Sequence, residues 1–320
     1  MSLGHVRAGH VASVCGVVLG YTADLIAGDP RRGHPVAGFG RLASALERRL
    51  WHDHRGWGAL HTALCAGGAV AVAAAAERAV RDRPLVRAGL TAATAWTVLG
   101  GTSLVREARA IGGALEAGDL AEARHRLPGL CGRDPLALDG PQIARAVVES
   151  VAENTSDAVV GALVWGALGG LPGLAGFRAV NTLDAMVGHR SPRYRRFGWA
   201  AARLDDAAGR PGSRLTAALT VLAAPDPAGA WRAWRRDGHR HPSPNAGPVE
   251  ASFAGALGVR LGGKLSYGGR VEHRPELNTM ARAVAPADIH RAARLSRRVG
   301  ALALATAVGV RLVAGRSTRR

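Results

Sequence analysis

The sequence predicts an all-α, polytopic integral membrane protein with roughly four to six membrane helices, one of them a broken or re-entrant hairpin. Apolar runs recur along the chain at about the 20 residues that a membrane-spanning helix needs. Hydrophobic residues make up 48% of the 320 residues, while aromatic residues make up only 4%. Such small apolar side chains let helices pack closely in a bilayer. We expect a single membrane-embedded domain over residues 1–320.

The first three candidate membrane segments lie near the N-terminus, at residues 11–27, 58–76 and 85–105. The second and third are free of charge except for Arg87, which lies near an end, where its side chain can reach the lipid head groups. Asp24 interrupts the first run, and no small-residue cleavage pattern follows it. We therefore interpret the first run as a membrane helix and not as a secretion signal.

Two polar stretches separate the apolar runs. Residues 106–156 carry apolar side chains at helical spacing, which predicts amphipathic helices. One of these helices is expected to begin near Gly140, with Asp139 as its N-cap. Residues 225–299 are rich in Pro, Gly, His and Arg and predict loops around short helices.

Three more apolar runs occupy residues 158–180, 215–224 and 300–314. The last two are short for a spanning helix, so buried helices at the membrane surface are the alternative interpretation. Residues 169–173 interrupt the first of them with the sequence Gly-Gly-Leu-Pro-Gly. Glycines and a proline can break a helix into two halves.

The formal net charge of +18 would indicate nucleic-acid binding in a soluble protein. Nearly all of this charge is arginine, Lys264 is the only lysine, and no basic stripe interleaved with aromatic residues appears. Arginine between apolar runs fits anionic lipid head groups and phosphate-bearing substrates. We expect a lipid bilayer as partner and no nucleic acid. Three isolated cysteines without CxxC spacing support neither a zinc site nor a disulfide framework.

The densest polar cluster stands at the entrance to the fourth run. In a helix, Glu149, Glu153 and Asp157 fall at i, i+4 and i+8 and share one face, with Asn154 beside them. Acids next to hydrocarbon are costly unless a metal, a cation or a substrate pairs with them. Carboxylate oxygens suit Mg²⁺ that carries a nucleotide phosphate. A solvated acidic helix face is the alternative.

A second cluster closes the same run. Asn181 and Asp184 share a helix face, and His189 and Arg190 follow them. A straight fourth run would place the two clusters on opposite sides of the membrane. We therefore hypothesise a re-entrant helical hairpin that returns Asn181 and Asp184 to the side of Glu153.

Further polar candidates lie on either side of these clusters. Asp205, next to Asp206, could contribute to cation binding, and Arg203 could clamp a phosphate. An interfacial helix whose arginines reach the head groups explains the same pattern. Asp29 and His34 frame a compact turn that could orient a substrate, although Asp-Pro is also a common turn-starter.

Residues 258–265 nearly match the phosphate-loop pattern GxxxxGK[ST]. Leu265 replaces the Ser or Thr that would hold Mg²⁺, and the segment follows a helical apolar pattern instead of a strand. We therefore do not expect a true phosphate loop. The glycine backbone and Lys264 could still contact an anion in another geometry.

Several motifs follow one another in a recognisable order. They are Gly28-Asp29-Pro30 with His34-Pro35-Val36, Glu153 to Val160, Asn181 to Gly188, Phe197 to Asp206, Ser243 to Gly247 with Glu250-Ala251, and Ala254 to Val259. In type and order they resemble the signatures of the CobD/CbiB family, over roughly residues 20 to 280.

The resemblance implies a multi-pass enzyme of cobalamin biosynthesis in the cell membrane, with its active site on the cytoplasmic side. It implies a ligase that joins aminopropanol phosphate to adenosylcobyric acid through an amide bond, giving adenosylcobinamide phosphate. ATP and Mg²⁺ are the implied cofactors. Association with other membrane enzymes of the pathway is also expected.

This reaction demands activation of a carboxylate, a metal that neutralises ATP, and cations for the substrate phosphate. On this hypothesis the metal ligands are Glu153, Asp157, Asp184 and Asp205. The nucleotide and phosphate contacts are Arg190, Arg203, Asn245 and Lys264. The catalytic residues are Glu149, Glu153, Asn154 and His189, with Glu149 or His189 deprotonating the attacking amine. The substrate contacts are Asp29, His34, Asn181 and Glu250.

Two other functions fit a chain of this composition. A membrane sensor of the same superfamily would need no ATP and would tolerate loss of the acidic clusters. A small-molecule transporter would use intramembrane acids for ion coupling, although the sequence shows no paired halves of the kind that inverted repeats leave.

Overall fold

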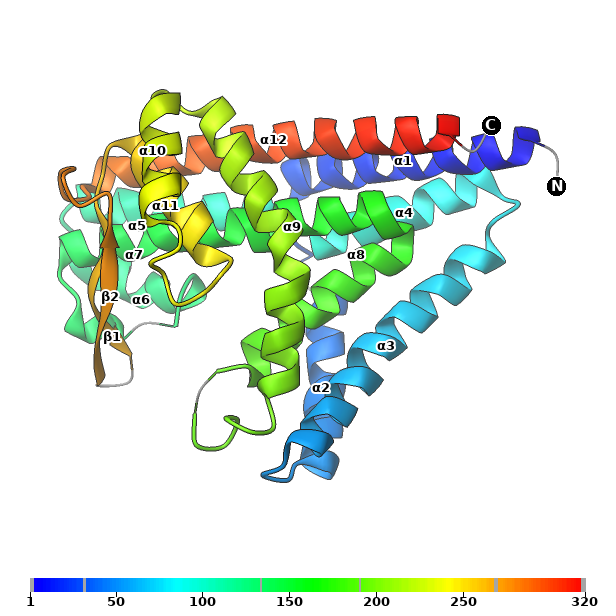
Figure 1. Ribbon diagram of the computed structural model, residues 1–320, viewed down its shortest axis with the longest axis horizontal. Coiled ribbons are helices and arrows are strands. Elements are labelled where there is room, and N and C mark those ends of the chain that lie inside the picture. Colours follow the sequence, from blue (N-terminus) through cyan, green and yellow to red (C-terminus); the bar gives the residue numbers. More distant parts are fainter. Residues whose placement is uncertain (1–2, 31–32, 133, 190, 268–269, 318–320) are drawn as a thin grey trace. The chain divides into compact units, whose positions relative to one another are not determined.

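The computed structural model describes residues 3–30, 33–132, 134–189, 191–267 and 270–317, which form helices and one two-stranded sheet (Figure 1). The chain divides into two compact units, each assembled from segments that lie far apart in the sequence. Unit 1 comprises Met1–Gly100, Gly161–Gly209 and Leu304–Arg320. Unit 2 comprises Gly101–Val160 and Arg210–Ala303. The single membrane-embedded domain over residues 1–320 stays a prediction.

Four of the described helices are long and apolar enough to cross a membrane. Their bounds are Gly9–Ala27, Arg55–Ala79, Gly140–Val187 and Pro286–Gly315. These helices contain the predicted runs at residues 11–27, 58–76, 158–180 and 300–314. The chain is therefore a helical, polytopic membrane protein, as the sequence predicted.

The third predicted run, residues 85–105, is not one helix, and this prediction was wrong. α4 (Pro84–Val98) ends where Leu99 becomes extended, and α5 (Gly101–Glu116) then starts anew. The guanidinium Nε of Arg178 donates to the last carbonyl oxygen of α4 at 2.8 Å, which satisfies an acceptor that a helix end leaves open. The 15 residues of α4 rise only about 22 Å, less than the hydrocarbon core of a bilayer.

The fifth predicted run, residues 215–224, forms the end of α9 (Trp199–Ala223), except for its last residue. The first half of α9 carries several charged side chains, and α9 is not among the described helices that are apolar enough to cross a membrane. Ala217 and Leu219 are buried. The alternative interpretation of this run, a buried helix, therefore describes it better than a membrane span.

Small residues let α1 (Leu3–Ala27) lie against α4 in unit 1. A Cβ added at Gly16 would press on Thr91, and one added at Gly20 would press on Ala95. A larger residue at either position would push the two helices apart, as in other membrane helix pairs with glycines four residues apart. Along the chain, α1 is followed by α2 (Pro35–Leu50), α3 (Arg55–Ala79) and then α4.

α8 (Gly161–Val187) is two helical arms joined by a sharp reversal. Gly170 adopts φ 63° and ψ −141°, a conformation that glycine reaches without steric cost, and Pro172 follows it. The arms before and after this glycine pack against each other, because Gly161 lies against the ring of Phe177. The predicted helical hairpin is therefore confirmed.

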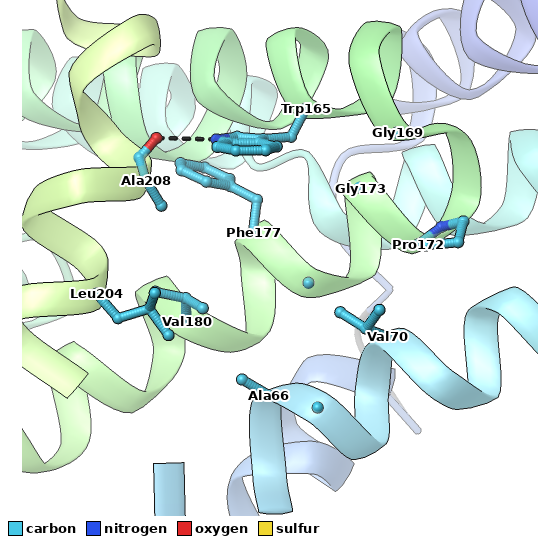
Figure 2. Close-up of a pocket in the computed structure, with 12 residues that line it drawn as sticks. Ala66, Val70, Trp165, Gly169, Pro172, Gly173, Phe177, Val180, Leu204 and Ala208 are labelled. Carbon is cyan, nitrogen blue, oxygen red and sulfur yellow. Dashed lines mark hydrogen bonds between the residues drawn. The ribbon is translucent and has the colours of Figure 1, made fainter. Parts of the chain in front are cut away.

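Tight contacts hold the two arms of the hairpin together, and Figure 2 shows them in close-up. A Cβ at Gly173 would collide with the carbonyl oxygen of Trp165, so the arms meet backbone to backbone here. The indole Nε1 of Trp165 donates to the carbonyl oxygen of Ala208 in α9 at 2.8 Å (Figure 2). An apolar cavity of about 450 Å³ lies between the hairpin, α3 and α9.

Unit 2 contains the amphipathic helices that the sequence predicted. α5 is followed by α6 (Leu120–Arg126) and by two short 3₁₀ turns, η1 (Leu127–Gly129) and η2 (Pro135–Ala137). α7 (Gly140–Thr155) begins with a capping box. The Asp139 carboxylate accepts the backbone N–H of Gln142, and the side-chain oxygen of Gln142 accepts the backbone N–H of Asp139. The predicted N-cap at Asp139 is therefore confirmed.

The C-terminal part of unit 2 contains a β-hairpin that the sequence did not predict. Gly258 ends a helix in the left-handed conformation, with φ 66°, although the apolar spacing of the preceding helix continues past it. Leu261 and Leu277 then face each other, fully buried, in the first pair of an antiparallel sheet. The elements of this part are α10 (Pro227–Asp237), α11 (Ala246–Leu257), β1 (Leu261–Tyr267), β2 (Arg270–Leu277) and α12 (Pro286–Ser317).

Candidate functional site

α7 carries the first predicted acid cluster, inside unit 2. Glu149 is only 2% exposed. Its carboxylate accepts the backbone N–H of Gly262 at 2.7 Å, and Arg145 lies 3.9 Å from the same oxygen. Gly262 has φ 84°, so the glycine-rich turn directs this amide toward Glu149 through a conformation that favours glycine. The anion that this glycine backbone meets is thus a carboxylate of the chain itself.

Glu153 belongs to a compact group with two residues that lie far from it in the sequence. Glu153, His241 and Glu250 each place one potential ligand atom within 4.8 Å of the others. His241 Nε2 lies 3.6 Å from Glu250 Oε1, and that oxygen is buried with no hydrogen-bond partner among the described residues. We call these three residues the Glu-His-Glu cluster. In the described part of the chain it is the one group with this metal-binding geometry.

The Glu-His-Glu cluster holds less charge than its residue types suggest. Burial raises the pKa of Glu250 well above its usual range, and the nearby carboxyls of Glu153 and Glu149 raise it further. Burial lowers the pKa of His241 to about 4, and the positive charge of Arg274 lowers it further. At neutral pH the imidazole is therefore neutral.

The orientation of His241 follows from its neighbours. Arg274 on β2 can only donate, and its guanidinium lies 3.2 Å from His241 Nε2. On the other side of the ring, Nδ1 accepts the backbone N–H of Ser243 at 3.0 Å. A neutral imidazole beside two carboxyl groups is a potential metal ligand.

Asp157 and Asn154 do not join this cluster. Asp157 lies in η3 (Ser156–Val160), a turn of π-helix. A π-turn adds a residue to the local helical repeat, so the predicted spacing of Glu149, Glu153 and Asp157 on one α-helical stripe is not kept. Asn154 donates within its own helix, to the carbonyl oxygen of Ser150 at 3.0 Å.

A second group of acids lies in unit 1, where α8 and α9 contribute Asp184, Asp205 and Asp206. Burial raises the pKa of Asp205 to about 7, and the charge of Asp184 raises it further. The Asn181 amide opposes this shift, since it donates to Asp205 at 3.5 Å. The structure thus brings Asn181 and Asp184 together with Asp205, and the sequence had assigned Asp184 and Asp205 to one set of metal ligands. Whether Asn181 and Asp184 share a membrane side with Glu153 stays a prediction.

Several other predicted site residues have local structural contacts. His34 is the N-cap of α2, where its Nδ1 accepts the N–H of Val36 at 3.2 Å. Asp29 is half-buried in the turn before it. His189 is exposed and lies edge-on to the Tyr194 ring, 4.9 Å between centroids.

Three of the predicted phosphate contacts remain to be placed. Arg203 is exposed on α9. Arg190 and the side chain of Lys264 lie outside the described residues. That these three residues contact a phosphate stays a prediction.

Comparison with known proteins identifies the family. The model of the CobD/Cbib protein family matches residues 17–296 of this chain. The chain belongs to the CobD/CbiB family. No solved structure matches the chain.

Curated members of the CobD/CbiB family are similar to this chain over most of their length. A protein of Mycobacterium tuberculosis named "Cobalamin biosynthesis protein CobD" is 53% identical over 298 residues, which cover 92% of this chain and 94% of the relative. Proteins of the same name are 45% identical in Geobacter metallireducens, with 79% and 83% covered, and 43% identical in Rhodobacter capsulatus, with 84% and 86% covered. The chain therefore has a role in cobalamin biosynthesis.

Two members of the site in this CobD/CbiB chain were missed from the sequence. His241 lies four residues before Asn245, so the Ser243 to Gly247 motif, if extended toward the N-terminus, would have included it. Arg274 gave no signal, because its position depends on the β-hairpin. Glu250 was predicted as a substrate contact, which stays a prediction, and the structure places it beside Glu153.

Proposed function

We propose that this protein is an adenosylcobinamide-phosphate synthase, which ligates (R)-1-amino-2-propanol phosphate to adenosylcobyric acid at the expense of ATP. Membership of the CobD/CbiB family supports the pathway. The observation that carries the chemistry is the Glu-His-Glu cluster, a set of metal-ligand groups in which Glu250 is buried and Glu153 is half-buried. We place the reaction at the cytoplasmic side of the cell membrane, where ATP is supplied.

The overall ligation sets three requirements. A carboxylate oxygen of adenosylcobyric acid leaves with a phosphoryl group of ATP, the amine nitrogen forms the new C–N bond, and the amine loses a proton. ADP and phosphate are released. The protein must therefore hold a divalent cation, bind phosphate and accept a proton.

The donor atoms of the Glu-His-Glu cluster fit a divalent cation. Two carboxylates from Glu153 and Glu250 are a usual protein contribution to a Mg²⁺ site, whose other positions go to water and substrate phosphates. The imidazole of His241 is a ligand that also suits Mn²⁺ or Zn²⁺. The buried Glu250 Oε1, which lacks a hydrogen-bond partner among the described residues, is an acceptor that a cation would satisfy. A bound cation would neutralise charge on the transferred phosphoryl group.

The aspartates of unit 1 are a second candidate cation site. Burial raises the pKa of Asp205 most, and the nearby charges of Asp184 and Asp206 raise it further. A cation would relieve the repulsion between these carboxylates.

The group that accepts the proton of the amine is proposed to be either Glu149, which is buried, or His189, which is exposed.

The proposal is tested by direct assay of the purified protein in detergent. The protein is incubated with adenosylcobyric acid, aminopropanol phosphate, ATP and MgCl₂, and the amide product and ADP are quantified by mass spectrometry. We expect equal amounts of both products, and none when the amine is omitted. Binding of adenosylcobyric acid without any amide product, across metal and nucleotide conditions, would indicate a sensor and overturn the ligase proposal.

Substitutions in the Glu-His-Glu cluster test its metal role. We expect Glu153→Gln and Glu250→Gln each to reduce ligation at least 100-fold, because each removes a cation ligand. The matched control is Glu276→Gln, which changes a glutamate that is 43% exposed and lies 3.8 Å from Arg260. Wild-type turnover in Glu250→Gln would refute the metal role while leaving the ligase activity standing. Asp157→Asn is the companion test for the acid in the π-turn.

A further inference from the structure

A cavity of about 490 Å³ lies within unit 2 and shares only His241 with the Glu-His-Glu cluster. α10 and α11, which lie side by side in Figure 1, contribute to its walls, together with the segment between them. Its volume is in the range of small-molecule sites. The side chains that matter for its chemistry are Arg214, Trp231, Trp234, Arg235 and His241.

The indole of Trp231, supported by Trp234, provides an aromatic wall. The Trp231 and Trp234 rings meet at an angle of 86°, with centroids 5.4 Å apart, so Trp234 braces Trp231 edge-on. Trp231 is nevertheless 48% exposed. The Arg235 guanidinium lies 5.5 Å from the centroid of the Trp231 ring. An exposed indole of this kind can stack on the face of a planar base.

Arg214 provides a fixed positive charge. Its NH1 donates to Ser213 Oγ at 2.8 Å, to the Pro244 carbonyl oxygen at 2.8 Å and to Asn245 Oδ1 at 3.1 Å. All three acceptors are neutral, and no carboxylate of the described residues forms an ion pair with Arg214. Burial, followed by the nearby charge of Arg210, lowers the pKa of Arg214. A bound anion would compensate a guanidinium held in this way.

His241 joins the cavity to the Glu-His-Glu cluster, because it belongs to both. A ligand whose anionic end reached His241 would therefore meet a cation held by Glu153 and Glu250. The walls of the cavity lie outside the four membrane-spanning helices, which makes it suitable for a water-soluble ligand.

We infer that this cavity binds the adenine nucleotide of the proposed ligation, with the base against Trp231 and the phosphates toward Arg214 and His241. The inference rests on the proposed function. The aromatic wall matches the base of a metal-bound nucleotide, the fixed arginine matches its phosphates, and the adjoining cation site matches its metal ion. Aminopropanol phosphate has no planar ring and would leave the indole wall unused. Asn245 is then a positioning residue, since it holds Arg214.

The first test measures ATP binding without adenosylcobyric acid, by quenching of intrinsic tryptophan fluorescence in the detergent-purified protein with MgCl₂. We expect Arg214→Gln and Trp231→Leu each to weaken ATP binding by roughly 5- to 100-fold, the range of a lost base stack or phosphate contact. Arg232→Gln, an exposed arginine of α10 that does not line the cavity, and Trp57→Leu, a 40% exposed tryptophan in unit 1, are the matched controls. Both should bind ATP like the wild type.

The second test separates this inference from the proposed function. In the ligation assay, Arg214→Gln and Trp231→Leu should raise KM for ATP and leave KM for aminopropanol phosphate unchanged. If ATP binds and these variants weaken it while no amide forms, the nucleotide site stands and the ligase proposal fails. If amide forms and KM for ATP is unchanged in both variants, the inference is overturned and the ligase proposal stands. A rise confined to KM for aminopropanol phosphate would assign the cavity to that substrate and likewise overturn the inference.

Discussion

Asp205 carries an electrostatic signature that can be measured. Its pKa lies at about 7 in the folded protein, because the carboxyl is buried and the charge of Asp184 is close. In the unfolded chain an aspartate has a pKa near about 3.9. The folded state therefore holds this proton more tightly, so its contribution to stability is complete below about pH 4 and is lost as the pH rises through about 7.

The thermal stability of the metal-free protein in detergent should accordingly fall between about pH 4 and pH 7 and level off above pH 7. Asp205→Asn cannot ionise, so we expect this variant to show a flatter profile and a higher midpoint than the wild type at pH 8. The measurement is thermal unfolding followed by size-exclusion chromatography across that pH range. Asp82→Asn, at a 66% exposed position, is the control. An equally steep profile for Asp205→Asn would contradict the assignment.

At the residue scale, local chemistry was readable from the sequence and long-range contact was not. The N-cap at Asp139 and the glycine at position 170 act on their immediate neighbours, so residue type and spacing were enough. Glu153, His241 and Glu250 meet only because α7 packs against α11 and the segment before it, and no local pattern reports that packing. The closeness of Glu250 to Glu153 was missed for the same reason.

At the element scale, the hairpin in α8 depends on two arms that touch through glycine. Gly173→Ala would place a methyl group on the carbonyl oxygen of Trp165, and backbone cannot move aside cheaply. Overpacking of this kind typically costs about 1–3 kcal/mol. We expect a lower midpoint of thermal unfolding and reduced yield of monodisperse protein.

The same turn offers a control for this substitution. A Cβ at Gly169 would meet no atom within 4 Å, so Gly169→Ala changes an adjacent glycine without collision. It should leave the midpoint near that of the wild type. Equal losses for the two variants would show that helix breaking by glycine, and not the contact with Trp165, matters at this turn.

The elements that the sequence failed to predict share a physical cause. The run at residues 85–105 is apolar throughout, but Arg178 from another helix satisfies the end of α4 and lets the chain turn at Leu99. β1 follows a helix whose apolar spacing continues past Gly258, where the left-handed conformation ends it. In both places hydrophobic periodicity persisted while the backbone changed direction, so periodicity alone could not find the boundary.

At the scale of the whole molecule, the hairpin yields a prediction about the membrane sides reached by the two acid clusters. Cys15, Cys65 and Cys131 are first replaced, and single cysteines are then placed at positions 153 and 184. We expect a membrane-impermeant maleimide to label both from the same side in oriented vesicles, because a re-entrant hairpin returns the chain to the side it came from. A cysteine in the loop after α2 serves as the reference that reports one side of the membrane. Labelling of positions 153 and 184 from opposite sides would contradict the hypothesis that they share a side.

The order in which the ribosome delivers the chain has a consequence for how unit 1 is completed. Most of unit 1 is contributed by the first hundred residues, but its last piece is the end of α12, Leu304–Arg320. That piece places Gly315 against His10 of α1, so two helices from distant parts of the sequence are neighbours. Unit 1 is thus complete only after α12 has been made, and α1 must remain without this partner while most of unit 2 is synthesised. A nascent chain cut short before α12 would leave the oldest part of the protein unfinished, even though all of its own first hundred residues were present.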